Sequence, residues 1–395
     1  MHLRFFSVIF LGLFSATASA DPAEFEQCIT RMQLQASAHG ISETTVQEVI
    51  PRLQYQSRVI ELDRSQPEFT QSFADYFDKR VSQSRIDQGR KLYAQFDTFL
   101  AELTRDYGVP GQYLVSFWGL ETNFGSYLGG MPTLDSLATL ACDPRRSEFF
   151  TSEFLLALEL LERENLRADQ MKGSWAGAVG HTQFMPSNYL RYAIDGDEDG
   201  TIDLWGSRRD ALASAANFLA QLGWQPQQRW GREVKLPANY DFAKAVQKRS
   251  LEDWRALGLR KADSGALPVA AGMDADLLMP AGHKGPVFLV YDNFEVIMQW
   301  NRSTSYALSV GHLADRIAGA GPLRQAIPDN QPRLARAEVI QMQELLIANG
   351  FDSGEPDGLV GPATRSALRE FQISAGLIGD GFPDRTTLTR LGVAL

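Results

Sequence analysis

Apolar residues recur at helical intervals along most of the chain from Asp21 to about Leu222. Within this region, the spacing predicts one helix over residues 84–108 that ends at Gly108, with an apolar face formed by Leu92, Phe96, Leu100 and Leu103. Pro110 then suits the first turn of the next helix, because its ring fixes a helical φ. The first half of the chain is therefore expected to be helical.

The pattern changes between Gly231 and Trp300. Short apolar runs bounded by Gly or Pro indicate strands in the segments REVKLP, ADLLMP and PVFLVYDNF, and the segment SLEDWRALG indicates one helix between them. We therefore expect an α+β protein that is predominantly helical, with a small β-containing insert.

A linker is indicated where Pro322, Pro328 and Pro332 alternate with small or polar residues. After it, RAEVIQMQELLIANG predicts a helix with an apolar face, and GPATRSALREFQ predicts a second helix. The segments DGLVGPAT (357–364) and DGFPDRTT (380–387) share Asp-Gly and a Thr at the same offset, which suggests a small duplicated helical module. The expected boundaries are a main domain at 21–320, a linker at 321–332 and a three-helix domain at 333–395.

The N-terminus has the pattern of a secretory signal peptide. Arg4 precedes the apolar run FFSVIFLGLF, and the small residues ATASA end at Ala20, so residues 1–20 are expected to be removed. The apolar run is too short to span a bilayer, and no cysteine follows the cleavage site to carry a lipid. We expect an exported, soluble protein of the periplasm with no membrane anchor.

Charge and cysteine content narrow the class further. The formal net charge is −10 and no basic cluster appears, which argues against nucleic acid as the main partner. The two cysteines, Cys28 and Cys142, suit a single disulfide in an oxidising compartment, and a nucleophilic cysteine is the weaker alternative.

The segment FWGLETNFG places one carboxyl group, Glu121, among aromatic residues and glycines. One interpretation is a surface glutamate at the end of a helix. The other is a catalytic acid whose pKa is raised by an apolar wall formed by Phe117, Trp118 and Phe124.

A second informative segment is GSWAGAVGHTQFMPSNY, residues 173–189. Three glycines among small residues indicate either a tightly packed helix or backbone that approaches a ligand closely. Zinc-protease chemistry is not supported, because the five histidines include no H-E-x-x-H pattern, and no G-x-S-x-G nucleophile elbow is present.

The segment DGDEDGTIDLW follows the pattern of a calcium-binding loop. Asp195, Asp197 and Asp199 alternate, Gly200 follows, and Thr201 would offer its carbonyl oxygen. The twelfth position holds Gly206 in place of the usual glutamate, so Asp210 is the nearest substitute. A solvated acidic turn is the alternative to a structural calcium site.

The segment WNRSTSYALSV places Trp300, Asn301 and Tyr306 around a polar turn that we expect to follow a strand. Aromatic rings and amides are the groups that hold sugars, although a turn in the core is the simpler interpretation.

These four segments occur, in this order, in the lytic murein transglycosylase B family, and the chain resembles a soluble member of it over roughly residues 25–313. The C-terminal unit resembles a peptidoglycan-binding module, although Asp384 replaces the second glycine of the family's Asp-Gly-x-x-Gly-x-x-Thr turn in its second half. The resemblance implies a lysozyme-like fold that cleaves the β-1,4 bond between N-acetylmuramic acid and N-acetylglucosamine. Peptidoglycan glycan strands would be the main partner, with other cell-wall enzymes as further partners.

The resemblance also implies roles for individual residues. Glu121 matches the family's single catalytic carboxylate, and sugar-contacting positions match Ser174, Gln183, Asn301 and Tyr306. Tyr76, Phe218 and Trp300 resemble the aromatic residues of the sugar subsites, and the calcium loop aligns with residues 195–210. The chemistry would need no cofactor.

A single carboxylate is consistent with this chemistry. Ordinary glycosidases need two carboxylates, whereas here one acid would protonate the glycosidic oxygen and then, as a base, activate the sugar's 6-hydroxyl to close a 1,6-anhydro ring. The alternatives are a hydrolytic muramidase, in which Asp135 or Asp143 would position water, and a non-catalytic scaffold that only binds the cell wall.

Overall fold

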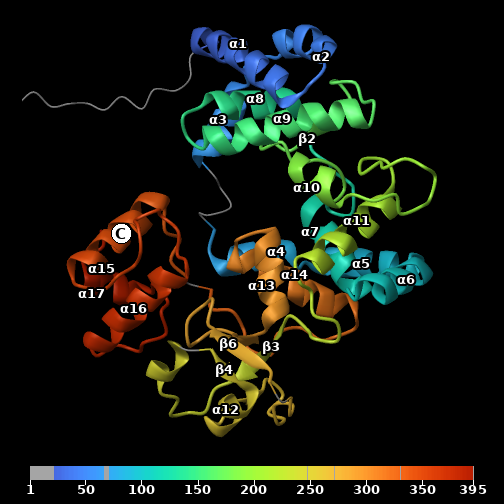
Figure 1. The fold of residues 1–395 in the computed structure, drawn as a ribbon. Helices are drawn as coiled ribbons and strands as arrows, with labels where there is room; N and C mark the ends of the chain where they lie inside the picture. Colours follow the sequence, from blue (N-terminus) through green and yellow to red (C-terminus); the bar gives the residue numbers. More distant parts are fainter. Residues whose placement is uncertain (1–21, 66–70, 247, 271, 330, 395) are drawn as a thin grey trace, which may run out of the picture.

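The structure is a computed structural model that describes residues 22–65, 71–246, 248–270, 272–329 and 331–394. The expected signal peptide lies outside these residues. Helices predominate in the described part, as expected, and its buried apolar residues form four hydrophobic cores (Figure 1). In the described ranges, no helix is both long enough and apolar enough to cross a membrane.

One core belongs to a helical lobe in which α8 packs along α9 and α1 crosses both. A short antiparallel pair of strands, β1 (Met131–Pro132) and β2 (Lys172–Gly173), lies at its edge. The helices of the lobe are α1 (Pro22–His39), α2 (Glu43–Glu48), α3 (Ser57–Ser65), α8 (Thr133–Cys142), α9 (Ser147–Arg163) and α10 (Pro186–Tyr192).

A second core surrounds α7, which packs against α5, α6, α11 and α14. This part of the molecule lies between the first lobe and the β-containing insert (Figure 1). Its helices are α4 (Phe73–Arg80), α5 (Gln83–Gln95), α6 (Asp97–Tyr107), α7 (Gly111–Thr122), α11 (Arg208–Gln221), α13 (Asp292–Trp300) and α14 (Thr304–Ile317).

Two details differ from the expected elements. The single helix expected over residues 84–108 is two helices, α5 and α6, separated at Phe96, whose ring packs edge-on against Trp118 at 6.1 Å. The segment before the polar turn is the helix α13 and not a strand, because Phe294 and Ile297 are buried at helical spacing and Asp292 and Glu295 lie in the first turn, where they stabilise the helix dipole. The stop at Gly108 is confirmed, since its φ of 71° is left-handed.

The insert contains an antiparallel five-stranded sheet with the strand order β4-β6-β7-β3-β5. The three strands indicated by the sequence are present as β3 (Gly231–Lys235), β6 (Asp274–Leu278) and β7 (Val287–Val290). The two shorter strands and the helix expected in SLEDWRALG complete the insert: β4 (Arg249–Ser250), β5 (Arg260–Lys261) and α12 (Leu251–Ala256).

The C-terminal module has three helices around its own core: α15 (Arg336–Ala348), α16 (Pro362–Ser374) and α17 (Arg385–Leu391). In Figure 1 the module, drawn in red, lies beside the yellow insert. Hydrogen bonds join it to the rest of the molecule, from His283 to Asp380 and from Arg365 to Thr304. The preceding segment is also held, since Arg333 pairs with Asp75 at 2.7 Å.

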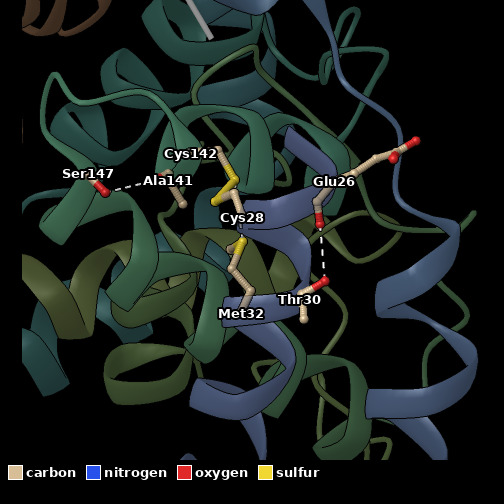
Figure 2. The surroundings of a disulfide bond; sticks show 7 residues. All are labelled: Glu26, Cys28, Thr30, Met32, Ala141, Cys142 and Ser147. Carbon is tan, nitrogen blue, oxygen red and sulfur yellow. Dashed lines mark hydrogen bonds between the residues drawn. A yellow bond between two sulfur atoms is a disulfide. The ribbon is translucent and has the colours of Figure 1, made fainter. Parts of the chain in front are cut away.

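A disulfide joins Cys28 in α1 to Cys142 at the end of α8 (Figure 2). The predicted disulfide is therefore confirmed, and Cys142 has no free thiol to act as a nucleophile. The bond closes a loop over a sequence separation of 114 residues and fastens the N-terminal helix to the first lobe.

Candidate active site

Glu121 lies at the end of a helix that is buried along almost its whole length. In α7, only Gln112 and Glu121 escape full burial. Because the surrounding residues are packed into the core, the Glu121 carboxyl group is held on a rigid element.

The glycines around Glu121 have a structural reason. After α7, Asn123, Phe124 and Gly125 take the left-handed conformation in succession, with φ of 49°, 59° and 77°. This reversal folds the Phe124 ring back onto Gly119, where an added Cβ would lie only 2.7 Å from the ring. Glycine at 119 is therefore needed for an aromatic residue to cover the helix end.

The Glu121 carboxyl group accepts a hydrogen bond from the Tyr306 hydroxyl, which comes from α14. Burial among apolar groups raises the pKa of Glu121 to about 7, against the opposing effect of hydrogen bonds from Tyr306 and Trp300 and of the charge of Arg80. Burial, and then the neighbouring Glu121, raise the pKa of Tyr306 well above its usual range, so Tyr306 keeps its proton to donate. The arrangement is that of a carboxylic acid that holds its proton near neutral pH.

Aromatic rings build a wall beside this carboxyl group. Trp300 is partly exposed, and its ring centroid lies 4.4 Å from Phe117 and 5.1 Å from Phe218. Phe218 is itself buried beneath Trp300, so it supports the wall instead of presenting a free face. Tyr76 is also buried, with the guanidinium of Arg80 5.2 Å from its ring centroid.

The segment 173–185 forms a turn-rich loop beside the end of α7, so the tight-helix interpretation is wrong for it. Gln183 has a left-handed φ of 50°, and its Nε2 donates to the carbonyl oxygens of Leu128 (3.0 Å) and Gly180 (2.9 Å). Ser174 accepts a hydrogen bond from the amide of Ala178. Gln183 therefore ties this loop to the chain that follows Glu121.

The remaining predicted contact, Asn301, lies on the surface at the C-terminal end of α13. It belongs to the polar turn between Trp300 and Tyr306, and its carbonyl oxygen accepts from the amide of Ser303 at 2.8 Å. The turn thus places two predicted residues at the Glu121 site and leaves the Asn301 side chain toward solvent.

The sequence reasoning missed the residues that join the two main segments of the site. The indole N–H of Trp118 donates to Nδ1 of His181 at 3.1 Å, and the Thr122 hydroxyl donates to the carbonyl oxygen of His181 at 2.8 Å. Burial lowers the pKa of His181 to about 4, so the ring stays neutral and keeps its acceptor. No local pattern marks His181, because its partners lie about sixty residues earlier.

The acidic loop brings together three of its predicted ligands. Carboxylate oxygens of Asp195, Asp197 and Asp210 lie within 4.8 Å of one another. Burial raises the pKa of Asp210, which accepts from the amides of Gly196 and Asp203, and the charge of Asp197 adds to this effect. Such a set of converging carboxylate oxygens fits a divalent cation.

Two other predicted ligands of this loop are placed differently. Asp199 turns one carboxylate oxygen to the amide and hydroxyl of Thr201, at 2.9 Å and 2.6 Å. The Thr201 side chain is thereby engaged within the loop, and its carbonyl oxygen is the group that the pattern predicts as a ligand.

The two acids considered as water-positioning residues have other partners. One carboxylate oxygen of Asp135 accepts from the amide of Gln54 at 2.5 Å. Asp143 is buried in the first lobe and pairs with Arg64 at 2.7 Å. Among the residues that the structure describes, neither of them contacts Glu121.

Comparison with known proteins gives a consistent result. Residues 24–315 match the family model described as a transglycosylase SLT domain, and residues 335–391 match the model of a putative peptidoglycan binding domain. The chain is 30% identical over 308 residues to membrane-bound lytic murein transglycosylase B of Escherichia coli (strain K12), which covers 74% of this chain and 82% of that protein.

Solved structures are similar over more of the chain. The crystal structure of SltB3 from Pseudomonas aeruginosa in complex with NAG-NAM-pentapeptide is similar with a TM-score of 0.88 and 42% identity, covering 93% of this chain and 99% of that one. The Escherichia coli lytic transglycosylase Slt35 in complex with calcium is similar with a TM-score of 0.63 and 30% identity, covering 76% and 94%.

Proposed function

We propose that Glu121 is the catalytic acid and base of this chain, which belongs to the transglycosylase SLT family and is a peptidoglycan lytic transglycosylase. The observation that carries this proposal is a carboxyl group with a pKa near 7, held by Tyr306 beside an aromatic wall. A group with a pKa near the working pH can both give and take a proton.

The proposed mechanism uses Glu121 twice. As an acid, it protonates the glycosidic oxygen between N-acetylmuramic acid and N-acetylglucosamine, while the substrate's own acetamido carbonyl stabilises the cationic C1. As a base, it then takes the proton of the muramic 6-hydroxyl, which attacks C1 and closes the 1,6-anhydro ring. Tyr306 orients the carboxyl group throughout.

We assign substrate contacts to the predicted residues according to their positions. Trp300 offers the partly exposed ring on which a sugar stacks, and Gln183 keeps its side-chain oxygen for a hydroxyl or acetamido N–H. Asn301, Ser174 and Tyr76 are assigned further sugar contacts because the family resemblance implies them, whereas the buried Phe218 would act by supporting Trp300.

A structural calcium ion and export to the periplasm complete the proposal. Asp195, Asp197 and Asp210 would hold the ion, with Asp199 and the carbonyl of Thr201 as further predicted ligands, and the ion would order the loop between α10 and α11. Residues 1–20 would direct export, 21–320 would catalyse, and 321–332 would link a peptidoglycan-binding domain at 333–395. The family matches at 24–315 and 335–391 support these boundaries.

The decisive experiment is cleavage of purified peptidoglycan in heavy-oxygen water. We expect unlabelled fragments with 1,6-anhydromuramic ends, each lighter by one water than a hydrolysis product. Label at the muramic C1 would show that water is the acceptor and would replace this proposal with a hydrolytic muramidase. No cleavage at all would favour a wall-binding scaffold.

A further inference from the structure

The two halves of the C-terminal module are built around the same polar network. In the first half, Gln343 donates to the Asp357 carboxylate (2.9 Å) and the Thr364 hydroxyl (3.1 Å), and accepts from the Gly358 amide (2.8 Å). In the second half, Gln372 makes the same bonds to Asp380 (3.1 Å), Thr387 (3.0 Å) and Gly381 (2.8 Å). We call residues 357–364 the first turn and residues 380–387 the second turn.

Both networks use only one oxygen of the aspartate. Oδ1 of Asp357 accepts from Gln343 and from the amide of Leu359, and Oδ1 of Asp380 accepts from Gln372 and from the amide of Phe382. Each turn therefore holds a fixed carboxylate whose second oxygen, Oδ2, faces away from the network. What that oxygen binds is where the two halves differ.

In the second turn, Oδ2 binds a short segment of the β-containing insert. The backbone amide and the ring Nδ1 of His283 approach Oδ2 of Asp380 at 2.9 Å and 2.6 Å. Gly282 packs so closely that an added Cβ would lie 3.0 Å from the carboxylate and 3.1 Å from the Phe382 ring. The second turn is thus occupied by a small residue, a backbone N–H and a nitrogen donor.

In the first turn, the equivalent groups are open. Asp357 is exposed, and among the described residues nothing is bonded to its Oδ2. Leu359, at the position of Phe382, keeps 37% of its surface exposed. Arg336 donates twice to the carbonyl oxygen of Asp357, which holds the turn in place without covering its carboxylate. The first turn is therefore preformed for an occupant of the same chemistry.

We propose that the first turn binds the peptide stem of peptidoglycan, whereas the second turn docks the module on the insert and is not available to a stem. The proposal rests on the proposed function, which makes peptidoglycan the substrate. A stem peptide offers groups like those that Gly282 and His283 supply in the second turn. Its alanines have small side chains, and its backbone N–H groups and the charged amino group of a diamino acid are donors. A glycan strand offers mainly hydroxyls, so the peptide matches this carboxylate better. A charged amino group on Asp357 makes the stronger, charge-assisted kind of hydrogen bond.

The test measures binding of a synthetic murein pentapeptide to the full chain carrying Glu121→Gln, so that cleavage does not enter. In this background, Asp357→Asn keeps an oxygen for Gln343 and Leu359 but removes the charge. We expect at least a tenfold loss of affinity, about 1.4 kcal/mol, and a smaller loss for Leu359→Ser. Asp352→Asn is the matched control, because Asp352 is an exposed acid of the same module that caps its own turn at Gly354, and it should bind as the parent does.

A second measurement compares co-sedimentation with intact sacculi and with sacculi from which the stems have been removed. We expect Asp357→Asn to weaken binding to intact sacculi and to leave the residual binding to stripped glycan unchanged, with the same melting temperature as the parent. Unchanged pentapeptide affinity in Asp357→Asn, or equal losses on both kinds of sacculi, would overturn the proposal. Failure of the proposed function would appear separately, as cleavage retained by Glu121→Gln itself.

Discussion

The catalytic unit contains two acidic sites that meet the same electrostatic difficulty in different ways. Glu121 is a single carboxyl group among aromatic rings, and its charge is disfavoured because burial removes part of its hydration. Asp195, Asp197 and Asp210 bring three carboxylates together, with oxygens within 4.8 Å of one another. Burial raises the pKa of Asp210, and the charge of Asp197 adds to this effect. One isolated carboxyl group can be neutralised by a proton, whereas three converging carboxylates offer the ligands of a cation. The number of oxygens, more than the burial, separates an acid catalyst from a metal site.

The largest expected effect comes from removing the proton at the first site. Glu121→Gln keeps the shape of the side chain but cannot transfer a proton, and we expect the cleavage rate to fall by at least about 10²–10⁴. The measurement is the release of anhydro-muropeptides from purified peptidoglycan. Asp135→Asn is the control, since Asp135 bonds Gln54 elsewhere, and we expect full activity. If Glu121→Gln kept a tenth or more of the parent activity, Glu121 would not be the catalytic acid.

The same substitution should change stability with pH. Because the folded-state pKa of Glu121 is raised to about 7, the folded protein holds a proton that the unfolded chain has lost, and stability falls as the pH rises from about 4.5 to 7. Glutamine does not titrate, so at pH 8 we expect Glu121→Gln to be more stable by about 2–3 kcal/mol, and at pH 4 to show no pH-linked gain. Denaturant unfolding at both pH values tests this, and an equal difference at the two would contradict a raised pKa.

The second site should respond to a cation and not to a proton. Adding calcium to chelated protein should stabilise the fold by about 2 kcal/mol when calcium is in some thirtyfold excess over its Kd, and raise the melting temperature by a few degrees. Asp210→Asn should abolish this shift. Asp203→Asn should keep it, because Asp203 caps Trp205 and Gly206 in the same loop outside the cluster. If millimolar calcium did not raise the melting temperature of the parent protein, the loop would be a solvated acidic turn and not a calcium site.

The smallest effect is a displaced pH profile. The hydrogen bond from Tyr306 lowers the pKa of Glu121, so Tyr306→Phe should raise that pKa further. Glu121 must be protonated to act as an acid, and the alkaline limb of the activity profile should therefore move to higher pH. Tyr127→Phe, at an exposed tyrosine, should leave the limb in place. A limb that moves to lower pH in Tyr306→Phe would show that this bond does not stabilise the charged carboxylate.

The sequence predicted the local part of each site better than the distant part. Glu121 was recognisable because its aromatic residues and glycines lie within four positions of it. Tyr306, which bonds to Glu121 from 185 residues away, was expected only as a sugar contact, from the residue types of its turn and from the family resemblance. Hydrophobic periodicity describes one helix at a time, whereas the meeting of α7 and α14 is decided by the packing of the whole core.

Side-chain orientation was also beyond the sequence. Phe218 was expected at an aromatic subsite, but the packing of α11 buries it beneath Trp300. The module is docked by two contacts, one between His283 and Asp380 and one between Arg365 and Thr304. The paired residues are 97 and 61 positions apart, so no local sequence pattern predicts either contact. The duplicated Asp-Gly turns were visible, yet only their surroundings show that one is occupied and the other open.

The disulfide between Cys28 and Cys142 affects how the chain responds to proteolysis and when its first lobe can be cross-linked during synthesis. The loop that it closes includes α7, so a protease cut anywhere between these residues leaves both fragments joined and Glu121 still attached to the first lobe. During synthesis Cys28 is made before Cys142, which ends α8. The disulfide can therefore form only after α1 through α8 have all been synthesised. A chain that contains this disulfide therefore also contains the complete segment that bears Glu121, the candidate acid.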